Sequence, residues 1–377
     1  MDRGNSFEVI IVGCGIAGAS LAYFLSRRGL TDIVILEREE QPGYHSTGRS
    51  AAVLVELDFV PSVLQLTILA ASFLRNPPEG FSQSPLLEQS GIMVMFQGDD
   101  WSMIEGVAPV FRQMGVSLEL LTPSQVVERF PVVSDDHFDG AVFLPEDGHI
   151  DVHELLWSYI RHARHEGVEL RCGVEVHGIR VERGRCRGLM TNEGEFTGRW
   201  VVNAAGAWAG IIGQLAGATQ IELTPYRRTV ATFAAPDGLD VTRWPLVSNY
   251  THKLFFKPES RGLLACPMDE DPVEPCDARP DELVIAQTID RLETLAPCLV
   301  PKSLRQKWAG LRTFAPDQSY IIGEDPSVKG FFWLAGQGGS GIETSPAAGQ
   351  VAAELLIDGR TSLIDPNLFS PARFAKD

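Results

Sequence analysis

Three glycines near the N-terminus constrain the fold of this 377-residue chain more than any other feature of its sequence. The motif consists of a β-rich run at residues 7–12 followed by Gly13, Gly15 and Gly18. Between a strand and a helix, the first glycine permits a tight turn, the second leaves room for a pyrophosphate and the third allows close helix–strand contact. The helix N-terminus, at Ile16 and Ala17, would offer amide donors and a positive dipole to phosphates. The motif therefore predicts a dinucleotide-binding unit.

A second buried strand, predicted over Ile33–Leu36, narrows the choice of dinucleotide because Glu37 follows it. A carboxylate at this place accepts hydrogen bonds from both ribose hydroxyls and opposes a 2′-phosphate. NADP is therefore disfavoured, whereas NAD and FAD remain. Arg38 comes next and is also predicted to contact the cofactor.

Two further segments favour FAD over NAD. Residues 43–52 are small and rich in hydroxyl groups, and residues 201–208 form an Ala/Gly-rich turn after a strand. The pyrophosphate and the ribityl chain of FAD would run past such segments. A nicotinamide cofactor does not need these two segments in addition to the glycine motif. The cofactor contacts predicted in the later parts of the chain are Ser46, Thr47, Gly48, Arg49, Ser50, Ala51, Val176, Ala205, Gly206 and Trp208.

The rest of the chain alternates between two patterns. Strand and helix patterns recur after residue 146 and after residue 310, and one helix opens with a capping-box pattern at Asp151–Glu154. Between about 220 and 310, β-type runs and a proline-rich acidic loop at Pro267–Pro280 indicate a mostly antiparallel domain. We therefore predict an α/β + β fold. It has a discontinuous Rossmann-type FAD-binding domain (1–80, 146–220 and 310–377) and an interleaved, mostly antiparallel β substrate domain (81–145 and 221–309).

Charge and cysteine content argue against several classes of partner. The chain has 32 Lys and Arg against 49 Asp and Glu, a formal net charge of −17, without a basic run. Neither nucleic acid nor an anionic membrane surface is expected as a partner. The 6 cysteines show no C-x-x-C pair and no regular spacing. We therefore expect no disulfide framework, no zinc site and a reducing, cytoplasmic compartment.

Two apolar stretches, Val9–Leu25 and Val201–Ala218, resemble membrane segments on a hydropathy scan. Asp2 and Glu8 accompany Arg3 before the first stretch, which is not the leader of a signal peptide. Glycines interrupt both stretches, and polar side chains interrupt the second, so a transmembrane helix is not expected either. We interpret each stretch as a strand, a turn and a helix.

Six segments, taken in order, match a known family. They are Gly13–Gly18, Tyr44–Ala52, Asn76–Phe81, Asn203–Trp208, Trp308–Phe314 and Gly330–Thr344. The chain resembles the D-amino-acid-oxidase superfamily of FAD oxidoreductases, and within it most closely the bacterial FAD-dependent D-arginine dehydrogenases. The resemblance covers nearly the whole chain and implies the fold of D-amino acid oxidase with FAD in an elongated pose. Neither His45 nor any cysteine lies in an attachment motif of the superfamily, so noncovalent FAD is expected.

In that superfamily the C-terminal glycine segment lies along the flavin. The resemblance carries this role onto Gly336, Gly338, Gly339, Gly341, Ile342 and Thr344. We expect a helix to begin near Ile342, with its N-terminus directed at the pyrimidine end of the ring, where negative charge collects on reduction. Ser340 is not expected to be a hydrolase nucleophile, because G-x-S-x-G requires a different spacing and no Asp/His partners are placed for it.

The resemblance implies that Arg312 and Arg228 hold the carboxylate of an amino acid substrate, beside Gly339 and Ser340. A planar guanidinium makes two parallel charge-assisted bonds to a carboxylate and so fixes the α-carbon over the flavin. Hydride transfer from the α-carbon to flavin N5 then gives an imino acid, which water converts to a 2-oxo acid and ammonia. Either arginine could instead be a surface salt-bridge partner, and the adjacent Arg227 complicates the assignment at position 228.

The side-chain pocket departs from the D-arginine dehydrogenase pattern. By alignment, Ile92 replaces the carboxylate near the substrate guanidinium, and other polar positions become Val53, Val55, Asp58 and Phe255. Burying an unpaired cation is costly, so a neutral or apolar D-amino acid is the expected substrate. Asp58 is either a replacement anionic partner or a solvated loop residue.

Other functions stay open at this point. Glycine, an N-methyl amino acid or a 2-hydroxy acid would suit the same carboxylate clamp, and the electron acceptor is a quinone or O₂. A flavoprotein that acts only as a binding or assembly factor is less favoured, because such a protein has no need to orient a carboxylate. No metal is expected, since the pairs His149/His153 and His162/His165 have no third ligand at suitable spacing. Exact substrate, stereochemistry and oligomeric state are not determined by these patterns.

Overall fold

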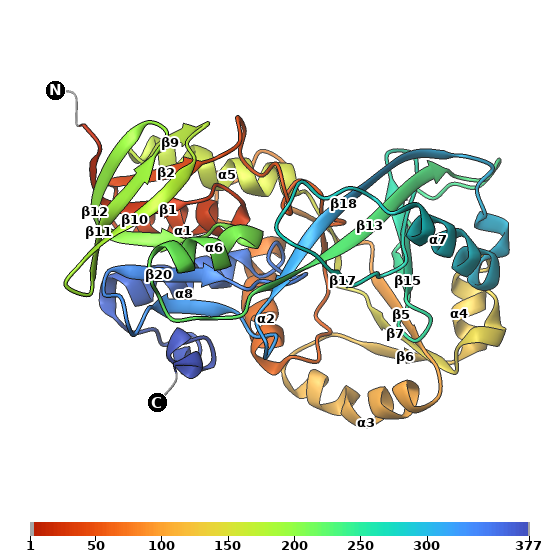
Figure 1. Ribbon diagram of the computed structural model, residues 1–377. Coiled ribbons are helices and arrows are strands. Elements are labelled where there is room, and N and C mark those ends of the chain that lie inside the picture. Colours follow the sequence, from red (N-terminus) through yellow and green to blue (C-terminus); the bar gives the residue numbers. More distant parts are fainter. Residues whose placement is uncertain (1–3, 376–377) are drawn as a thin grey trace.

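The computed structural model describes residues 4–375 and has two lobes, each built around its own β-sheet (Figure 1). One lobe contains an 8-stranded sheet and the other a 9-stranded sheet. Two long paired strands, β13 (Thr224–Ala234) and β18 (Leu304–Phe314), run from one lobe to the other. Asp2 and Arg3, on which part of the leader argument rests, lie outside the described residues.

The centre of the 8-stranded sheet is parallel. β1 lies between β2 and β12, β9 pairs with β2, and β20 pairs with the C-terminal part of β12. β10, β11 and β19 add antiparallel pairings to this core. The strands are β1 (Ser6–Val12), β2 (Ile33–Glu37), β9 (Glu169–Cys172), β10 (Val176–Glu182), β11 (Arg185–Thr191), β12 (Gly194–Asn203), β19 (Ile321–Glu324) and β20 (Phe331–Ala335).

Apolar clusters cover both faces of this sheet. In β1, Val9 and Ile11 belong to one cluster, whereas Ile10 and Val12 belong to the other. Successive side chains of a strand point to opposite faces, so a strand buried on both faces reads as a continuous apolar run. The strand, turn and helix predicted for both apolar stretches are confirmed. The helices of this lobe are α1 (Ile16–Arg27), α2 (Pro61–Arg75), α5 (Val152–His165), α6 (Ala209–Leu215) and α8 (Ser345–Asp358).

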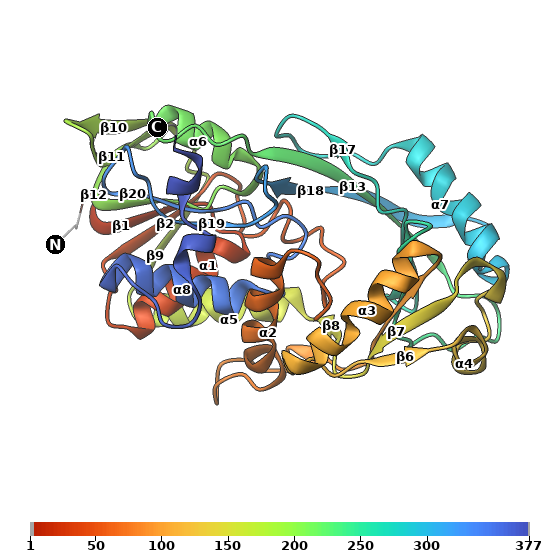
Figure 2. The same ribbon diagram turned by 90° about the horizontal axis from the view of Figure 1, so that it is seen from below.

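The 9-stranded sheet is antiparallel except where β14 pairs with β5. Helix α7 (Glu282–Leu295) packs into the apolar cluster of one face, and α3 (Asp99–Gln113) into that of the other. The remaining strands are β5 (Ile92–Phe96), β6 (Glu119–Leu121), β7 (Gly140–Leu144), β14 (Leu246–Asn249), β15 (Leu254–Glu259), β16 (Gly262–Cys266) and β17 (Asp271–Pro272), and the remaining helix is α4 (Pro123–Arg129). Figure 2 shows α3 and α7 at this end of the molecule, away from α1 and α8.

A third, three-stranded sheet consists of β3 (Val53–Leu54), β8 (Gly148–Ile150) and β4 (Leu87–Glu88). The predicted fold class, a Rossmann-type domain with a mostly antiparallel β domain, is confirmed. The domain boundaries stay a prediction. The boundary drawn at residue 310 falls inside β18, which pairs with β13 on both sides of that residue.

Two local predictions need correction. Helix α8 begins at Ser345 rather than near Ile342, because residues 340–344 first form turns closed by hydrogen bonds from Thr344 N to Ser340 O (3.1 Å) and from Ser345 N to Ile342 O (3.2 Å). The second correction concerns the start of α5, where half of the predicted capping box is present. Asp151 accepts a hydrogen bond from Glu154 N (2.8 Å), but the Glu154 carboxylate accepts one from Gln83 N (2.8 Å) instead of returning to the cap.

Candidate functional site

The glycine motif forms the turn between β1 and α1, and its glycines have different surroundings. Gly13 has a φ of +102°, and a Cβ there would lie 2.6 Å from the carbonyl oxygen of Ala204. A Cβ on Gly18 would lie 2.0 Å from the carbonyl oxygen of Gly13. At Gly15 the nearest atom to such a Cβ is Thr47 Oγ1, at 3.2 Å. Gly13 and Gly18 therefore serve chain packing, whereas Gly15 leaves space in front of the helix N-terminus.

A cavity of about 390 Å³, the first cavity below, opens beside this turn. Glu37 lies on its wall, and its two carboxylate oxygens accept hydrogen bonds from Cys14 N (2.8 Å) and Glu39 N (2.9 Å). Each oxygen retains a second lone pair that a ligand hydroxyl can use. The predicted cofactor residues that line this cavity are Gly13, Gly15, Glu37, Arg38, Ser46, Thr47, Val176, Ala205, Gly206 and Trp208.

Flat side chains form one side of the first cavity. The guanidinium carbon of Arg38 lies 4.1 Å from the ring centroid of Trp208, and the His45 ring centroid lies 4.5 Å from it. Glu39 accepts a hydrogen bond from Arg38 (2.9 Å), and His45 Nε2 lies 2.8 Å from the same carboxylate oxygen. These contacts hold planar surfaces against the cavity, which suits a ligand with an aromatic ring.

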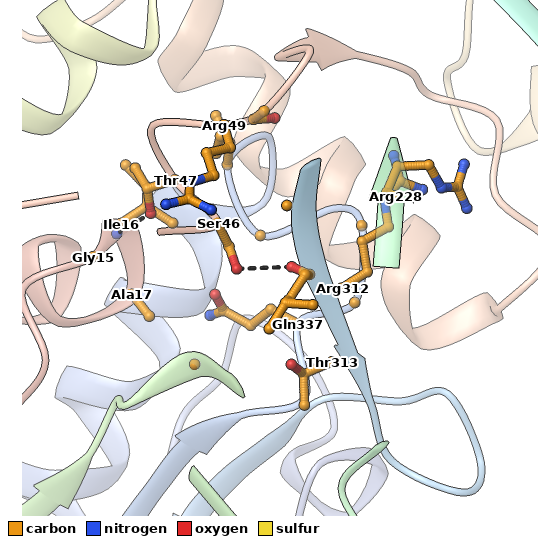
Figure 3. A pocket seen from close by; sticks show the side chains of 18 of the residues that line it. Gly15, Ile16, Ala17, Ser46, Thr47, Arg49, Arg228, Arg312, Thr313 and Gln337 are labelled. Atoms are coloured by element: carbon orange, nitrogen blue, oxygen red, sulfur yellow. Dashed lines mark hydrogen bonds between the residues drawn. The ribbon is translucent and has the colours of Figure 1, made fainter. Parts of the chain in front are cut away.

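A second cavity, of about 130 Å³, adjoins the first (Figure 3). The two share Gly15, Ser46, Thr47, Ala204 and Gly206, so together they form an elongated site that passes the N-terminus of α1. The predicted cofactor residues that line the second cavity are Gly15, Ile16, Ala17, Ser46, Thr47, Arg49, Ser50, Ala51, Gly206, Gly336, Gly338, Gly339, Gly341 and Ile342. Gly18, Gly48 and Thr344 line neither cavity.

Segments far apart in the sequence meet at β18 to close the second cavity. Ser46 Oγ donates a hydrogen bond to the carbonyl oxygen of Leu311 (2.7 Å), drawn as a dashed line in Figure 3. Gly338 N donates one to the carbonyl oxygen of Thr313 (2.9 Å). Both partner carbonyls flank Arg312, so the hydroxyl-rich segment and the C-terminal glycine segment are fixed against the residues on either side of this arginine.

The cavity walls contain donors that the protein itself leaves without partners. Gln337 lines the second cavity, and its Nε2 atom is buried and has no hydrogen-bond partner within residues 4–375. Buried polar atoms are almost always hydrogen-bonded, so such a donor marks a place where a ligand carbonyl would bind. With the open space at Gly15 and the carboxylate of Glu37, the described residues fit an elongated dinucleotide.

Arg228 and Arg312 lie on adjacent antiparallel strands and share one face. Arg312 is opposite Tyr226, and Arg228 is two residues further along the same strand, so the two are diagonal neighbours (Figure 3). Both line the second cavity. Arg227 lies on the opposite face and is ion-paired with Asp271 (2.8 Å). Of these two adjacent arginines, Arg228 lines the cavity and Arg227 does not.

The two arginines create an excess of positive charge inside the site. The side chain of Arg312 has no hydrogen bond or salt bridge within residues 4–375. Arg228 is 6% exposed and donates one hydrogen bond, to Glu270 (2.8 Å), but its Nε and Nη1 atoms are buried without a partner in the described chain. Burial, followed by the charge of Arg228, lowers the pKa of Arg312 to about 10. The Arg312 guanidinium therefore stays cationic at neutral pH, so a small anion is the expected ligand.

The residues predicted for the side-chain pocket are only partly brought together at the cavity. Phe255 and Gly339 line the second cavity. Ile92 is 0% exposed and belongs to the same apolar cluster as Phe255, against which Val53 and Val55 also pack. Asp58 accepts a hydrogen bond from Val60 N (2.7 Å) before α2, and Ser340 N donates one to Gln337 O (3.1 Å). The pocket roles of these residues stay predictions.

Glu343, next to the lining residue Ile342, is a buried carboxylate that the sequence analysis did not single out. It is 8% exposed, and one of its carboxylate oxygens accepts a hydrogen bond from Val55 N (2.7 Å). Burial raises the pKa of Glu343 to about 8. The signal was available, because a carboxylate stands between Ile342 and Thr344 in a segment otherwise made of small or apolar residues. Only its burial, which is not visible in the sequence, makes that carboxylate unusual.

The two-lobed fold and the elongated site are typical of a dinucleotide-dependent enzyme, with a cavity lined by two arginines beside the cofactor site. Residues 8–355 match the model of the DAO family, described as FAD dependent oxidoreductase. The chain belongs to this family, and its cofactor is FAD. Within residues 4–375, no helix has the length and apolar character needed to cross a membrane. In the same part of the chain, no group of three or more His, Cys, Asp and Glu side chains is placed to hold a metal ion.

Three similar proteins illustrate the range of the family. FAD-dependent oxidoreductase domain-containing protein 1 of Bos taurus is 26% identical, over 97% of this chain and 84% of the relative. Human sarcosine dehydrogenase, a mitochondrial protein, is 24% identical, over 94% of this chain and 40% of the relative. The crystal structure of L-proline dehydrogenase from P. horikoshii superimposes with a TM-score of 0.87 at 25% identity, over 98% of each chain. None of these is a D-arginine dehydrogenase, so that closer resemblance stays a prediction, as does the cytoplasmic compartment.

Proposed function

We propose that this protein oxidises a neutral amino acid whose carboxylate is held by Arg312 and Arg228. The observation that carries the proposal is that the guanidinium of Arg312 has no hydrogen bond or salt bridge within residues 4–375, although the residue lines a cavity. An arginine without an anion in such surroundings is costly unless a ligand supplies one. A carboxylate would be bound by two parallel charge-assisted hydrogen bonds.

The residues of the chain have distinct tasks in this proposal. Gly15 and the N-terminus of α1 receive the pyrophosphate of FAD, Glu37 the ribose hydroxyls, and Gln337 a carbonyl of the flavin end. FAD, when bound, would supply the hydride acceptor. Arg312 fixes the carboxylate, and Arg228 contributes the two donors that Glu270 leaves free. Catalysis then depends on positioning and electrostatics more than on side-chain chemistry.

The preferred side chain is apolar in this proposal. Phe255, Val230 and Ile342 line the second cavity, and Ile92 lies in the apolar cluster around Phe255. A cationic side chain would lose its hydration without gaining a partner there. We therefore expect leucine, methionine or phenylalanine to be better substrates than arginine or lysine, with the D-enantiomer preferred.

A secondary amine is the second candidate substrate. Two of the similar proteins are named for sarcosine and for L-proline, and both of these amino acids carry a carboxylate next to a secondary amine. The same arginine clamp would hold either compound. Glycine and 2-hydroxy acids fit the clamp as well, but they place nothing in the apolar part of the cavity.

Anaerobic bleaching of the flavin by a substrate panel tests the proposal. The panel contains D- and L-leucine, D-methionine, D-arginine, glycine, sarcosine and L-proline, and the loss of oxidised-flavin absorbance is followed over time. Fast bleaching by an apolar D-amino acid supports the first candidate, and fast bleaching by sarcosine or proline supports the second. Full retention of colour with every compound would instead favour a binding or assembly protein. Adding O₂ or a quinone to the bleached enzyme then identifies the electron acceptor.

Attachment of the cofactor is tested separately. His45 Nε2 lies 2.8 Å from a carboxylate oxygen of Glu39. Of the 6 cysteines, 3 are buried, namely Cys14, Cys186 and Cys266. We expect acid precipitation to release all of the flavin into the supernatant. Flavin that stays with the pellet would contradict the noncovalent assignment.

A further inference from the structure

We propose that Glu343 accepts the ammonium proton of the bound amino acid, so that the amine is neutral before its C–H bond breaks. This inference rests on the proposed function, since it requires an amine substrate held at Arg312. The N–H bond of the ammonium group breaks, an O–H bond forms on the carboxylate, and the electron pair stays on nitrogen. That lone pair is what assists departure of the hydride from the α-carbon. The proton returns to water between turnovers.

The position of Glu343 is the first argument. It follows Gly341 and Ile342, which line the second cavity together with Arg312. Its carboxylate accepts hydrogen bonds from Val55 N (2.7 Å) and from the hydroxyl of Ser340, and both donors are residues predicted for the substrate pocket. Glu343 itself lines neither cavity, and its carboxylate is buried next to these lining residues, in the turn that precedes α8.

The charges around Glu343 are the second argument. The carboxylate has no salt-bridge partner within the described chain, but Arg312 and Glu343 each act on the other electrostatically. An amino acid zwitterion needs a cation for its carboxylate and an acceptor for its ammonium group. Arg312, which lines the second cavity, and Glu343, which is buried next to the lining residue Ile342, supply such a cation and such an acceptor. A carboxylate clamp alone does not require the second group.

The titration behaviour of the surrounding groups agrees with a proton acceptor. The pKa of Glu343 is raised to about 8, mainly by burial and also by the carboxylate of Asp58, although the hydrogen bonds from Val55 N and Ser340 and the charge of Arg312 oppose the rise. Burial also raises the pKa of Asp58. Tyr320, packed behind the turn, hydrogen-bonds to Thr344 Oγ1 (2.8 Å) and has a pKa raised by burial, so it stays neutral. A general base works best when its pKa lies near the working pH, and a pKa of about 8 is far closer to neutrality than that of an exposed glutamate.

A structural role has to be separated from this chemical one, because Glu343 also ties β3 to the turn before α8. Glu343→Gln separates them, since the amide oxygen can still accept the hydrogen bond from Val55 N while the side chain can no longer accept a proton. Glu354→Gln is the matched control. It makes the same chemical change within α8, where Glu354 accepts hydrogen bonds from Gln350 and Thr361.

The decisive measurement is the rate of anaerobic flavin reduction as a function of pH, with the best substrate of the panel. In wild type and Glu354→Gln, the rate of flavin reduction should fall as the pH is lowered through about 8, the pKa of Glu343. Glu343→Gln should be slower by roughly 100-fold near neutral pH, the contribution of a positioned general base. The fall in its rate should occur at a higher pH, at which the substrate ammonium group loses its proton without help from the protein. A fall in the rate of Glu343→Gln at the same pH as in wild type overturns the proposal.

A binding measurement without turnover distinguishes this inference from the proposed function. Propionate, a carboxylate without an amine, is titrated into each protein and followed by the change in the flavin spectrum. Glu343→Gln should bind it as wild type does, and Arg312→Met should not. Propionate binding that is lost in Glu343→Gln would show that the residue shapes the carboxylate site and would overturn its role as a proton acceptor. Failure of wild type to bind propionate or to be bleached by any amino acid would reject the proposed function itself.

Discussion

The walls of the two cavities differ in how much backbone and how many side chains they contain. The first is held between a glycine turn, the end of β2 and flat side chains, and its wall at α1 consists mostly of backbone. The second receives charged and apolar side chains from both lobes, among them Arg228, Arg312 and Phe255. The first therefore selects a ligand mainly by shape and backbone donors, and the second by charge and side-chain volume. Changes at the glycine turn should remove the cofactor, whereas changes at the arginines and the apolar side chains of the second cavity should leave it bound and alter the reaction.

The largest effect is expected for Gly15→Leu, which should abolish flavin binding. Gly15 has extended dihedral angles (φ −79°, ψ −172°) that any residue can adopt, so the loss would come from occupied space and not from backbone strain. Flavin per protein after purification is the measurement. Gly106→Leu, in α3 where a Cβ meets nothing within 4 Å, is the control and should keep its flavin. A yellow Gly15→Leu protein would remove the glycine turn from the cofactor site.

Arg312→Met should reverse that pattern, with flavin retained and turnover lost. Removing a buried charge-paired clamp costs about 2–4 kcal/mol in kcat/KM. Arg312→Lys should lose a similar part of kcat/KM, because a point charge cannot replace a planar bidentate donor. Arg305→Met changes an exposed arginine on the same strand and should behave as wild type. Unchanged kinetics in Arg312→Met would exclude a carboxylate role at this position.

Side-chain preference tests the apolar part of the second cavity. D-leucine should be favoured over D-arginine by more than the ~1–3 kcal/mol of a methylene difference, because the cation is desolvated without a partner. Ile92→Glu should shift preference toward D-arginine, whereas the neutral Ile92→Gln should not. The measurement is kcat/KM for both substrates. D-arginine as the best substrate of the unaltered enzyme would assign the anionic partner to Asp58 instead.

The smallest expected effect concerns stability as a function of pH. The pKa of Glu343 is raised to about 8 in the folded protein, so the stability gained by holding this carboxyl protonated is present at low pH and is lost as pH rises through that value. The melting temperature of wild type minus that of Glu343→Gln should fall by a few degrees between about pH 5 and about pH 9. Thermal unfolding of the substrate-free, flavin-bound proteins provides the measurement, and a flat difference would contradict the raised pKa.

The sequence by itself determined the parts of the protein that depend on local sterics. The tight turn at Gly13 and the close contact at Gly18 involve atoms of neighbouring strands and helices in one short unit, so a glycine pattern next to an apolar run is sufficient to predict them. The same holds for Glu37, whose place at the end of β2 follows from the length of the unit. The fold class followed because strand and helix periodicity changes visibly along the chain.

Tertiary structure alone decided which polar groups face the second cavity and what charge they carry. Arg227 and Arg228 are adjacent in sequence, yet pairing with β18 turns the first toward Asp271 and the second toward Arg312. Helix α8 begins at Ser345, later than expected, because residues 340–344 form turns before it in the chain. The residue pattern does not reveal these turns. Glu343 acquires its raised pKa from burial and from Asp58, which lies far away in the sequence. Burial and electrostatic fields sum over neighbours from distant segments, so no local pattern encodes them.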